Sequence, residues 1–186
     1  KKKNITLGWT GGVNKRSVSE MALCFMLGLC RNIFNSGYKL KQSKWEKNGG
    51  FQLTGKTIGI IGCGYVGSDV IQLLAPFNCT LLVHDIVDKS DFCREHGASV
   101  ANLEKVIEQS DVITIHVPLT KLTRHMVDQD FLQRMKQTAF LINTSRGDVV
   151  DQDALKNSLT CGSIAGAAID VFAMEPPSDM ELLSLP

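Results

Sequence analysis

The stretch "GIIGCGYVGSDV", residues 59–70, decides the fold class of this chain. Its three glycines, Gly62, Gly64 and Gly67, follow an apolar run directly and open a run with helical spacing. In such a strand–loop–helix unit the first glycine allows a tight turn, the second lets the backbone approach a pyrophosphate, and the third lets helix and strand pack closely. Free N–H groups and a positive dipole at the start of the helix attract phosphate. The sequence therefore predicts a phosphate-binding loop of the dinucleotide type.

An acidic residue strengthens this interpretation, because a glycine pattern alone is weakly specific. Asp85 ends the next apolar run, about 20 residues on, where a carboxylate can bind both ribose hydroxyls of an adenosine. A carboxylate there also repels a 2′-phosphate, and Ile86 and Val87 follow without an arginine that could receive one. NAD is therefore favoured over NADP. The alternative is that Asp85 caps a turn and the glycines only pack.

Short apolar runs alternate with amphipathic stretches from residue 57 onward. The predicted strands are 57–61, 80–84, 112–117, 139–143 and 166–170. The predicted helices between them are 66–75, 90–96, 103–109 and 151–159, with Pro76 ending the first. Each predicted strand is almost continuously apolar, which is typical of strands covered on both faces in a parallel sheet. Repeated strand–helix–strand units predict an α/β fold with a doubly wound parallel sheet, the Rossmann type.

The residues before this region have a different pattern. Ser17-Val18-Ser19-Glu20 fits a capping box that would begin a helix. The apolar run 21–30 is about half of the roughly 20 residues that a membrane-spanning helix needs, so we expect a helix covered by another domain or subunit. We interpret 1–49 as an N-terminal strand and a long apolar helix, 50–176 as the Rossmann core, and 177–186 as the start of a return to a second domain.

The charge and cysteine content exclude several classes of function. Lys and Arg total 20 against 19 Asp and Glu, a net charge of +1, so no global field favours nucleic acid or an anionic membrane. The N-terminal residues lack the continuous apolar core of a signal peptide. The six cysteines contain no C-x-x-C pair, which argues against a zinc site. We expect no metal, no nucleic-acid or membrane partner, and reduced core thiols in a cytoplasmic protein.

Over almost its whole length the chain resembles the D-isomer-specific 2-hydroxyacid dehydrogenases, the family that includes D-3-phosphoglycerate dehydrogenase. The matching stretches are "NKRSVSE" (14–20), "GFQLTGKTIGIIGCGYVG" (50–67), "HVPLT" (116–120), "LINTSRGDVVDQDAL" (141–155) and "AAIDVFAMEPP" (167–177). The last two are the specific ones, because many nucleotide-binding folds share the glycine loop but few share "NTSRG" followed by "DVFxxEP". The resemblance implies an oxidoreductase that transfers hydride between NAD(H) and a D-2-hydroxyacid or its 2-keto acid.

The resemblance implies roles for three charged side chains. Arg146 corresponds to the family's substrate-carboxylate arginine, and its planar guanidinium can bind a carboxylate bidentately beside the carbonyl that hydride attacks. Glu175 corresponds to the acidic partner of the catalytic histidine, whose protonated form it stabilises. Asp170 corresponds to the aspartate that binds the nicotinamide carboxamide. The alternatives are a solvated arginine in a turn, an exposed acid before two prolines, and a strand-end cap.

The resemblance also implies further contacts with NAD. Beside Gly62, Gly64, Gly67, Asp85, Arg146 and Asp170, the predicted cofactor-binding residues are Tyr65, Val66, His116, Val117, Pro118, Thr144 and Ser145. Tyr65 and Val66 would lie beside the pyrophosphate. Thr144 and Ser145 would line the nicotinamide side. His116 is the only histidine expected near the nicotinamide, and we interpret its role as structural.

The family's acid–base histidine is not among these residues. It lies in a "PHxxG"-like motif shortly after the Glu-Pro stretch, and this chain stops at Pro186 before any such motif. The resemblance therefore implies the cofactor domain of a longer enzyme, which would bind NAD without completing the reaction. It also implies a homodimer through the apolar 21–30 helix, whose composition requires a cover.

Other functions and substrates stay open. One alternative is an NAD-binding regulator like the family's corepressor members, which can also carry Arg146 and Glu175. Another is the NAD domain of an adenosylhomocysteine hydrolase. The stretch "NTSRGDVVD" argues against this alternative. The substrate side chain is selected mostly by the missing domain, so phosphoglycerate, glyoxylate, lactate-like and sugar-derived hydroxyacids all fit the sequence.

Overall fold

Six parallel strands form one sheet in the order β3-β2-β1-β4-β5-β6. The computed structural model describes residues 8, 10–46 and 50–185. Its strands are β1 (Thr57–Ile61), β2 (Thr80–His84), β3 (Ala98–Val100), β4 (Val112–Ile115), β5 (Phe140–Asn143) and β6 (Gly166–Ile169). The strand order reverses between β1 and β4, and open α/β sheets bind ligands at the carboxyl ends of the strands beside such a switch point. The predicted doubly wound parallel sheet is confirmed.

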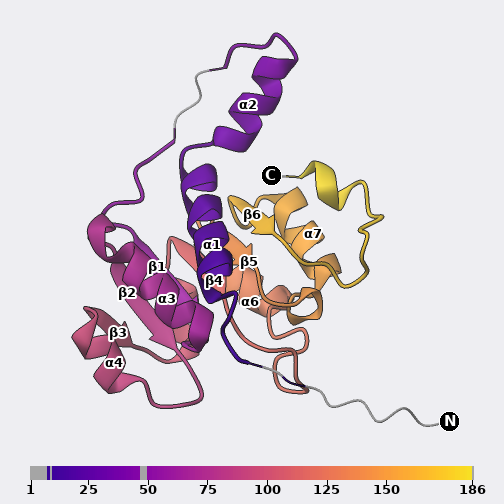
Figure 1. Cartoon of the computed structure of the whole chain (residues 1–186). Helices are drawn as coiled ribbons and strands as arrows, with labels where there is room; N and C mark the ends of the chain where they lie inside the picture. Colours follow the sequence, from indigo (N-terminus) through magenta and orange to yellow (C-terminus); the bar gives the residue numbers. More distant parts are fainter. Residues whose placement is uncertain (1–7, 9, 47–49, 186) are drawn as a thin grey trace, which may run out of the picture.

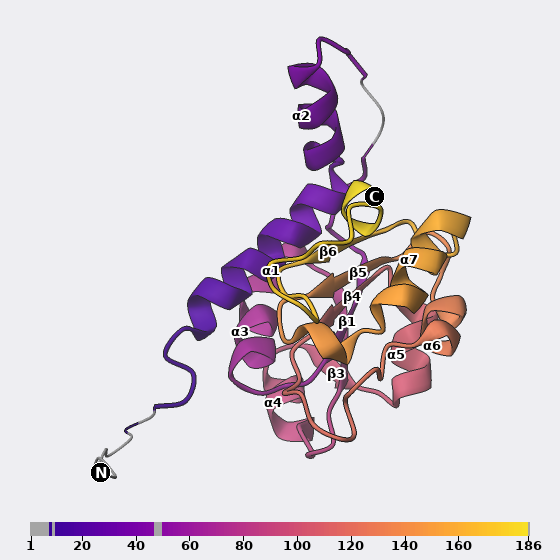
Figure 2. The same cartoon turned by 90° about the vertical axis from the view of Figure 1, so that its right-hand side faces the viewer.

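Helices cover both faces of the sheet (Figures 1 and 2). One layer contains α1 (Lys15–Cys30), α3 (Tyr65–Leu74) and α4 (Ser90–Glu95), and the other contains α5 (Leu103–Gln109), α6 (Gln129–Arg134) and α7 (Gln152–Cys161). Single turns of 3-10 helix are η1 (Ala75–Phe77), η2 (Gly147–Val149) and η3 (Leu182–Ser184). An apolar cluster lies between the sheet and each helical layer.

The continuous apolar runs of the central strands explain this layering. All residues of β4 are buried: Ile113 and Ile115 pack into the cluster under α5, α6 and α7, and Val112 packs into the cluster under α1 and α3. Full burial of an aliphatic side chain of this size contributes about 1.5–3 kcal/mol. Both faces of β4 are therefore buried in the core.

Several short elements differ from those predicted. The predicted set omits β3, whose three residues are exposed or half-buried, and α6, whose start depends on a local cap. Asp128 Oδ1 accepts the backbone N–H of Phe131 at 2.9 Å and so begins α6. The strands predicted over 112–117 and 166–170 end two residues and one residue early, because the chain leaves the sheet there to form loops at its carboxyl edge.

The start of α1 differs from the predicted capping box. The helix begins at Lys15 after Asn14, no side chain caps it, and Ser17 lies exposed inside its first turn. The hydroxyl of Ser19 donates instead to the carbonyl of Lys15 at 2.8 Å. The capping-box prediction is wrong because the turn ending at Asn14, in which Gly12 has a φ of 75°, starts the helix earlier.

The predicted helix over the apolar run 21–30 forms part of α1, and a second helix, α2 (Ile33–Lys41), follows it. They meet at a bend where Asn32 has a φ of 53°. Helix α2 leaves the body of the molecule and buries none of its residues (Figures 1 and 2). The ring of Phe34 packs so closely on Gly28 that a Cβ there would lie 2.3 Å from it. The predicted N-terminal strand falls largely on residues 1–7 and 9, outside the described residues.

Within residues 8, 10–46 and 50–185, no single helix has the length and apolar content needed to cross a membrane. The bent pair α1 and α2, whose axes differ by 68°, meets that requirement together, by length and composition only.

Candidate cofactor and substrate site

The glycine loop follows β1 directly and is closed by backbone contacts. Gly62 has a φ of 93°, and a Cβ at this position would lie 2.5 Å from the carbonyl oxygen of His116. A Cβ on Gly67 would lie 2.0 Å from the carbonyl oxygen of Gly62. Gly64 differs, because its Cβ would meet no atom within 4 Å. The protein itself thus requires glycine at the first and third positions, whereas the space beside Gly64 is open.

The start of α3 fits a phosphate group. Gly64 precedes the helix, no side chain caps it, and no acidic residue lies in its first turn. The first N–H groups of a helix have no partner within the helix, so those of Tyr65, Val66 and Gly67 face the loop opening. With the space beside Gly64, they form a cradle that a pyrophosphate can enter.

Asp85 joins the loop after β2 to the glycine loop. Its Oδ2 accepts the backbone N–H of Cys63 at 2.6 Å, and its Oδ1 accepts the backbone N–H of Val87 at 2.9 Å. The second contact is the turn-capping role of the alternative interpretation, and the first ties the carboxylate to the predicted phosphate loop. Each carboxylate oxygen has a further lone pair, so Asp85 can also accept ribose hydroxyls.

His116 lies behind the glycine loop at the end of β4. Its backbone N–H donates to the carbonyl of Ile61 at 2.8 Å, and its Nε2 lies 2.9 Å from Thr114 Oγ1. Burial lowers the pKa of His116 to about 4, so the ring is neutral at pH 7. Val117 follows beside Gly62, and Pro118 is exposed at the loop surface.

The loop after β5 is held by Asn143. Its side-chain Oδ1 accepts the backbone N–H of Ser145 at 3.0 Å and the Ser145 hydroxyl at 2.8 Å. Its Nδ2 donates to the carbonyl of Arg146 at 3.0 Å. Thr144 and Ser145 are buried, and the Thr144 hydroxyl has no hydrogen-bond partner among the described residues. Asn143 is not among the predicted site residues. Its only signal in the sequence is that it is a polar residue at the end of an apolar run.

Arg146 is exposed on this fixed loop. Its Nη1 donates to the carbonyl of Ser145 at 2.6 Å, and within the described part of the chain no salt bridge involves it. The next residue is locked, because a Cβ on Gly147 would lie 2.0 Å from the backbone of Phe172. Asp148 pairs with the Arg124 guanidinium, a contact that the sequence does not predict. The Arg146 guanidinium thus remains available to an anionic ligand.

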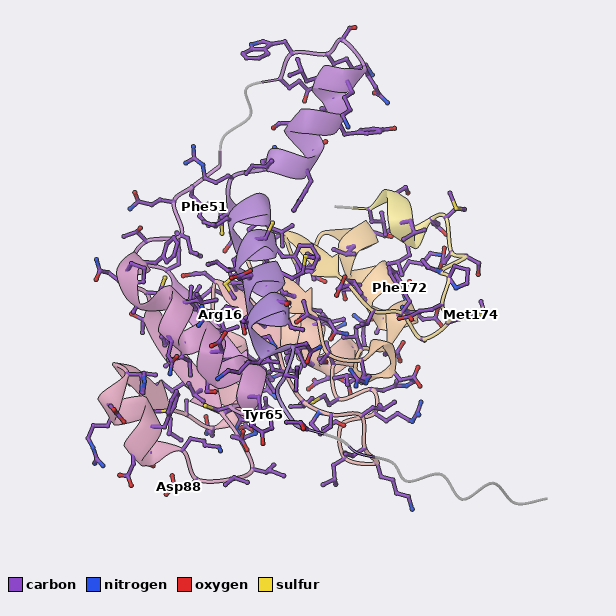
Figure 3. The ribbon with its side chains drawn as sticks, in the orientation of Figure 1. Arg16, Phe51, Tyr65, Asp88, Phe172 and Met174 are labelled. Atoms are coloured by element: carbon purple, nitrogen blue, oxygen red, sulfur yellow. The ribbon has the colours of Figure 1, made fainter. Side chains whose placement is uncertain are left out.

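The segment after β6 contains the other two predicted acids (Figure 3, where Phe172 is labelled). Asp170 is exposed, and its backbone N–H donates to the carbonyl of Asn143 at 3.0 Å. Glu175 is also exposed, and its Oε1 accepts the backbone N–H of Phe172 at 3.1 Å. No hydrogen bond or ion pair among the described residues joins Glu175 to a histidine. The carboxylate therefore closes a local turn.

Parallel strands bring these positions to one edge of the sheet. Every loop described above follows the carboxyl end of a strand, and β2, β1, β4, β5 and β6 are successive neighbours. The glycine loop and Arg146 therefore lie at the same edge, on strands separated only by β4. Over the same described residues, no group of three His, Cys, Asp or Glu side chains could hold a metal ion, and all six cysteines are free.

Comparison with known proteins matches this architecture. Residues 23–186 match the family model described as "D-isomer specific 2-hydroxyacid dehydrogenase, NAD binding domain". The chain is 38% identical to glyoxylate reductase from Korarchaeum cryptofilum, over 99% of this chain and 58% of that protein. It is 35% identical to D-3-phosphoglycerate dehydrogenase from Bacillus subtilis, over 93% of this chain and 33% of that protein.

Solved structures of NAD-dependent dehydrogenases also superpose on this chain. An NAD-dependent formate dehydrogenase from Staphylococcus aureus, in complex with NAD, superposes with a TM-score of 0.83 at 35% identity, covering 90% of this chain and 52% of that one. D-lactate dehydrogenase from Aquifex aeolicus, complexed with NAD and lactic acid, gives a TM-score of 0.82 at 31% identity, covering 91% of this chain and 54% of that one. The chain thus spans about half the length of most of these relatives. It belongs to the D-isomer-specific 2-hydroxyacid dehydrogenase family and contains that family's NAD-binding domain.

Proposed function

We propose that the complete protein transfers hydride between NAD(H) and a D-2-hydroxyacid or its 2-keto acid. The observation that carries this proposal is an Arg146 guanidinium that pairs with no carboxylate of the described residues, at the same sheet edge as the glycine loop of an NAD-binding domain. The planar guanidinium can bind a carboxylate through two parallel hydrogen bonds, and the relatives include glyoxylate and hydroxypyruvate reductases. The substrate class is therefore a small acid with a carbonyl or hydroxyl beside its carboxylate.

In this proposal, one group of residues binds the cofactor and Arg146 binds the substrate. The start of α3 and Asp85 would hold the pyrophosphate and the adenosine ribose, and Asp170, Thr144 and Ser145 would contact the nicotinamide half. NAD, when bound, supplies or accepts the hydride. Arg146 would hold the substrate carboxylate so that the neighbouring carbonyl carbon faces the cofactor.

The reaction also needs a proton donor, and the described residues do not include a histidine in contact with Glu175. His116 is neutral and bonded to Thr114, and it is not placed beside Glu175 by any described contact. Glu175 is a carboxylate at the substrate side whose second oxygen makes no described contact. We propose that it stabilises a protonated histidine from outside this chain, which would donate the proton to the carbonyl oxygen.

Assembly and location are further parts of the proposal. The exposed apolar side chains of the N-terminal helices are Met21, Ile33, Phe34, Tyr38 and Leu40, and Trp45 follows them. Apolar area of this kind supports a homodimer through α1 and α2. The free thiols and balanced charge support a cytoplasmic protein without nucleic-acid or membrane partners.

A turnover screen of the complete protein tests the activity. NADH oxidation is followed with a panel of 2-keto acids, including glyoxylate, hydroxypyruvate, pyruvate and a phosphorylated keto acid. We expect at least one substrate to be reduced to its D-hydroxyacid, with NADH preferred over NADPH. Binding of NADH without turnover of any keto acid would instead support the regulatory alternative.

A further inference from the structure

A buried carboxylate lies close to the proposed phosphate site. Asp69 is only 2% exposed, and it lies in α3, four residues beyond Tyr65 at the start of that helix. Four residues correspond to about 6 Å along a helix axis. The loop and first turn, residues 62–68, contain no basic side chain that could balance this charge. An ionised Asp69 would therefore oppose the binding of a pyrophosphate, which carries two negative charges.

Arg16 provides the balancing charge from another element. Its Nη2 donates to Asp69 Oδ1 at 3.0 Å, and its side chain is 51% exposed. The other oxygen of Asp69 is buried and has no partner among the described residues, so Arg16 is the cation with a described bond to this carboxylate. An unpaired buried carboxylate destabilises the folded state. The ion pair with Arg16 therefore stabilises the buried Asp69 and also balances its negative charge.

The fold holds Arg16 beside the first turns of α3. Figure 3 labels Arg16 on α1 and Tyr65 near the start of α3, and α1 packs along α3. The hydroxyl of Ser19 lies 3.3 Å from the carbonyl of Val66. Gly12 lies against the Tyr65 ring, where a Cβ would be 2.7 Å from the ring carbons. The N-terminal turn of α1 and the residues before it thus line the helix that would bind the phosphates.

We propose that Arg16 is a positioning residue for dinucleotide binding, which neutralises Asp69 so that the start of α3 keeps its attraction for pyrophosphate. The inference rests on the NAD-binding role of the glycine loop. Two unit charges roughly 8 Å apart, at an effective dielectric constant of about 30, change an equilibrium constant about tenfold. The effect should follow the charge of the ligand, whereas a purely structural ion pair would affect all ligands equally.

Ligands of different charge separate these two roles. Affinities of this chain for NAD, ADP-ribose and adenosine are measured by calorimetry, with adenosine as the ligand that lacks phosphate. Arg16→Gln should weaken NAD and ADP-ribose about tenfold and change adenosine less than twofold. Adding Asp69→Asn to Arg16→Gln should restore both affinities to within about twofold, and Arg16→Lys should largely retain them. Arg134→Gln removes a salt bridge to Glu108 of the same 3.0 Å length and serves as the matched control, with no expected change.

Three results would overturn the inference: an equal loss for all three ligands, no loss at all, or a loss that Asp69→Asn does not restore. The last would indicate direct contact between Arg16 and phosphate. If Arg16→Gln does not fold, Asp69→Asn alone decides, because removing the negative charge should tighten NAD a few fold, and unchanged or weaker binding would contradict the role. Failure of the unaltered chain to bind NAD or ADP-ribose would reject the NAD-binding role itself.

Discussion

The loop after β1 and the two segments after β5 and β6 lie at the same edge of the sheet but are held in different ways. Gly62 and Gly67 are fixed by close backbone packing, and Asp85 bonds across to the glycine loop. Arg146 and Glu175 are exposed, and the described bonds of each side chain go only to backbone groups of their own segments. The proposed adenosine side is thus preformed, whereas the groups proposed for substrate chemistry make no described contact beyond their own segments.

The two regions differ in the partners of their side chains and not in the edge of the sheet at which they lie. Asn143 fixes the loop that carries Arg146, and Gly147 locks that loop against the segment that leads to Glu175. A loop held in this way, with a guanidinium that has no carboxylate partner among the described residues, is suited to receive an anionic ligand without reorganisation of its backbone. Changes on the substrate side should therefore affect turnover, and changes on the adenosine side should affect folding and cofactor binding.

The largest expected effect is that of Arg146→Ala in the complete protein. Loss of the guanidinium should lower kcat/KM for the keto acid about a thousandfold, or about 4 kcal/mol, because the carboxylate is no longer held in position. The affinity of this chain for NAD should be largely kept, because the proposal assigns the Arg146 side chain to the substrate carboxylate rather than to the cofactor. Near-normal kcat/KM would remove Arg146 from the substrate site, and a large loss of NAD affinity would erase the difference between the two regions.

The glycine loop allows the opposite test on this chain alone. Gly67→Ala should lower the free energy of unfolding by about 3 kcal/mol or more, because its Cβ would lie 2.0 Å from a backbone oxygen. Gly64→Ala is the matched control: its φ of −83° accepts alanine and its Cβ meets nothing, so folding should be unchanged. NAD binding should nevertheless weaken in Gly64→Ala, since the methyl group occupies the cradle. Unaltered binding in that variant would place the pyrophosphate elsewhere.

Asp85 provides a test of cofactor selection. Asp85→Ala should weaken NAD about thirtyfold, because charge-assisted hydrogen bonds to hydroxyls contribute about 2 kcal/mol. It should also reduce the preference for NAD over NADP. Asp85→Asn keeps an acceptor for the Cys63 N–H and serves as the control for loop structure. A preference that survives in both variants would exclude Asp85 as the selecting residue.

The smallest expected effect concerns pH and His116. A histidine pKa lowered from 6.5 to about 4 means that the unfolded chain binds more protons than the folded chain between these pH values. Stability from this group is complete above pH 6.5 and falls as the pH decreases toward 4. From pH 7 to pH 5 the loss should be about 2 kcal/mol at most. Urea unfolding of the unaltered chain and His116→Gln should show this extra slope only in the former; parallel pH profiles would contradict it.

The sequence indicates the central strands well and the long-range contacts poorly. The runs that form β1, β2 and β4 are apolar almost throughout, so burial on both faces follows from composition. β3 has only three residues at the sheet edge, and its pairing with β2 depends on tertiary context. The apolar run 21–30 likewise predicts α1 but not α2, which begins after a bend at Asn32.

The candidate site divides in the same way. Gly62, Gly67 and Asp85 are recognisable because the motif places them at fixed intervals around a strand and a helix. The pairs Arg16–Asp69 and Arg124–Asp148 join residues from separate elements, and no local pattern indicates them. Asn143 is an intermediate case. The sequence shows a polar residue at the end of an apolar strand, but it does not predict the three hydrogen bonds that this side chain makes.

A calorimetric titration of this chain with NAD, and then with NADP, tests the preformed cofactor site most directly. We expect one NAD per chain to bind, a higher melting temperature in its presence, and binding of NADP at least tenfold weaker. No heat of binding and no shift in melting temperature at millimolar NAD would contradict the account.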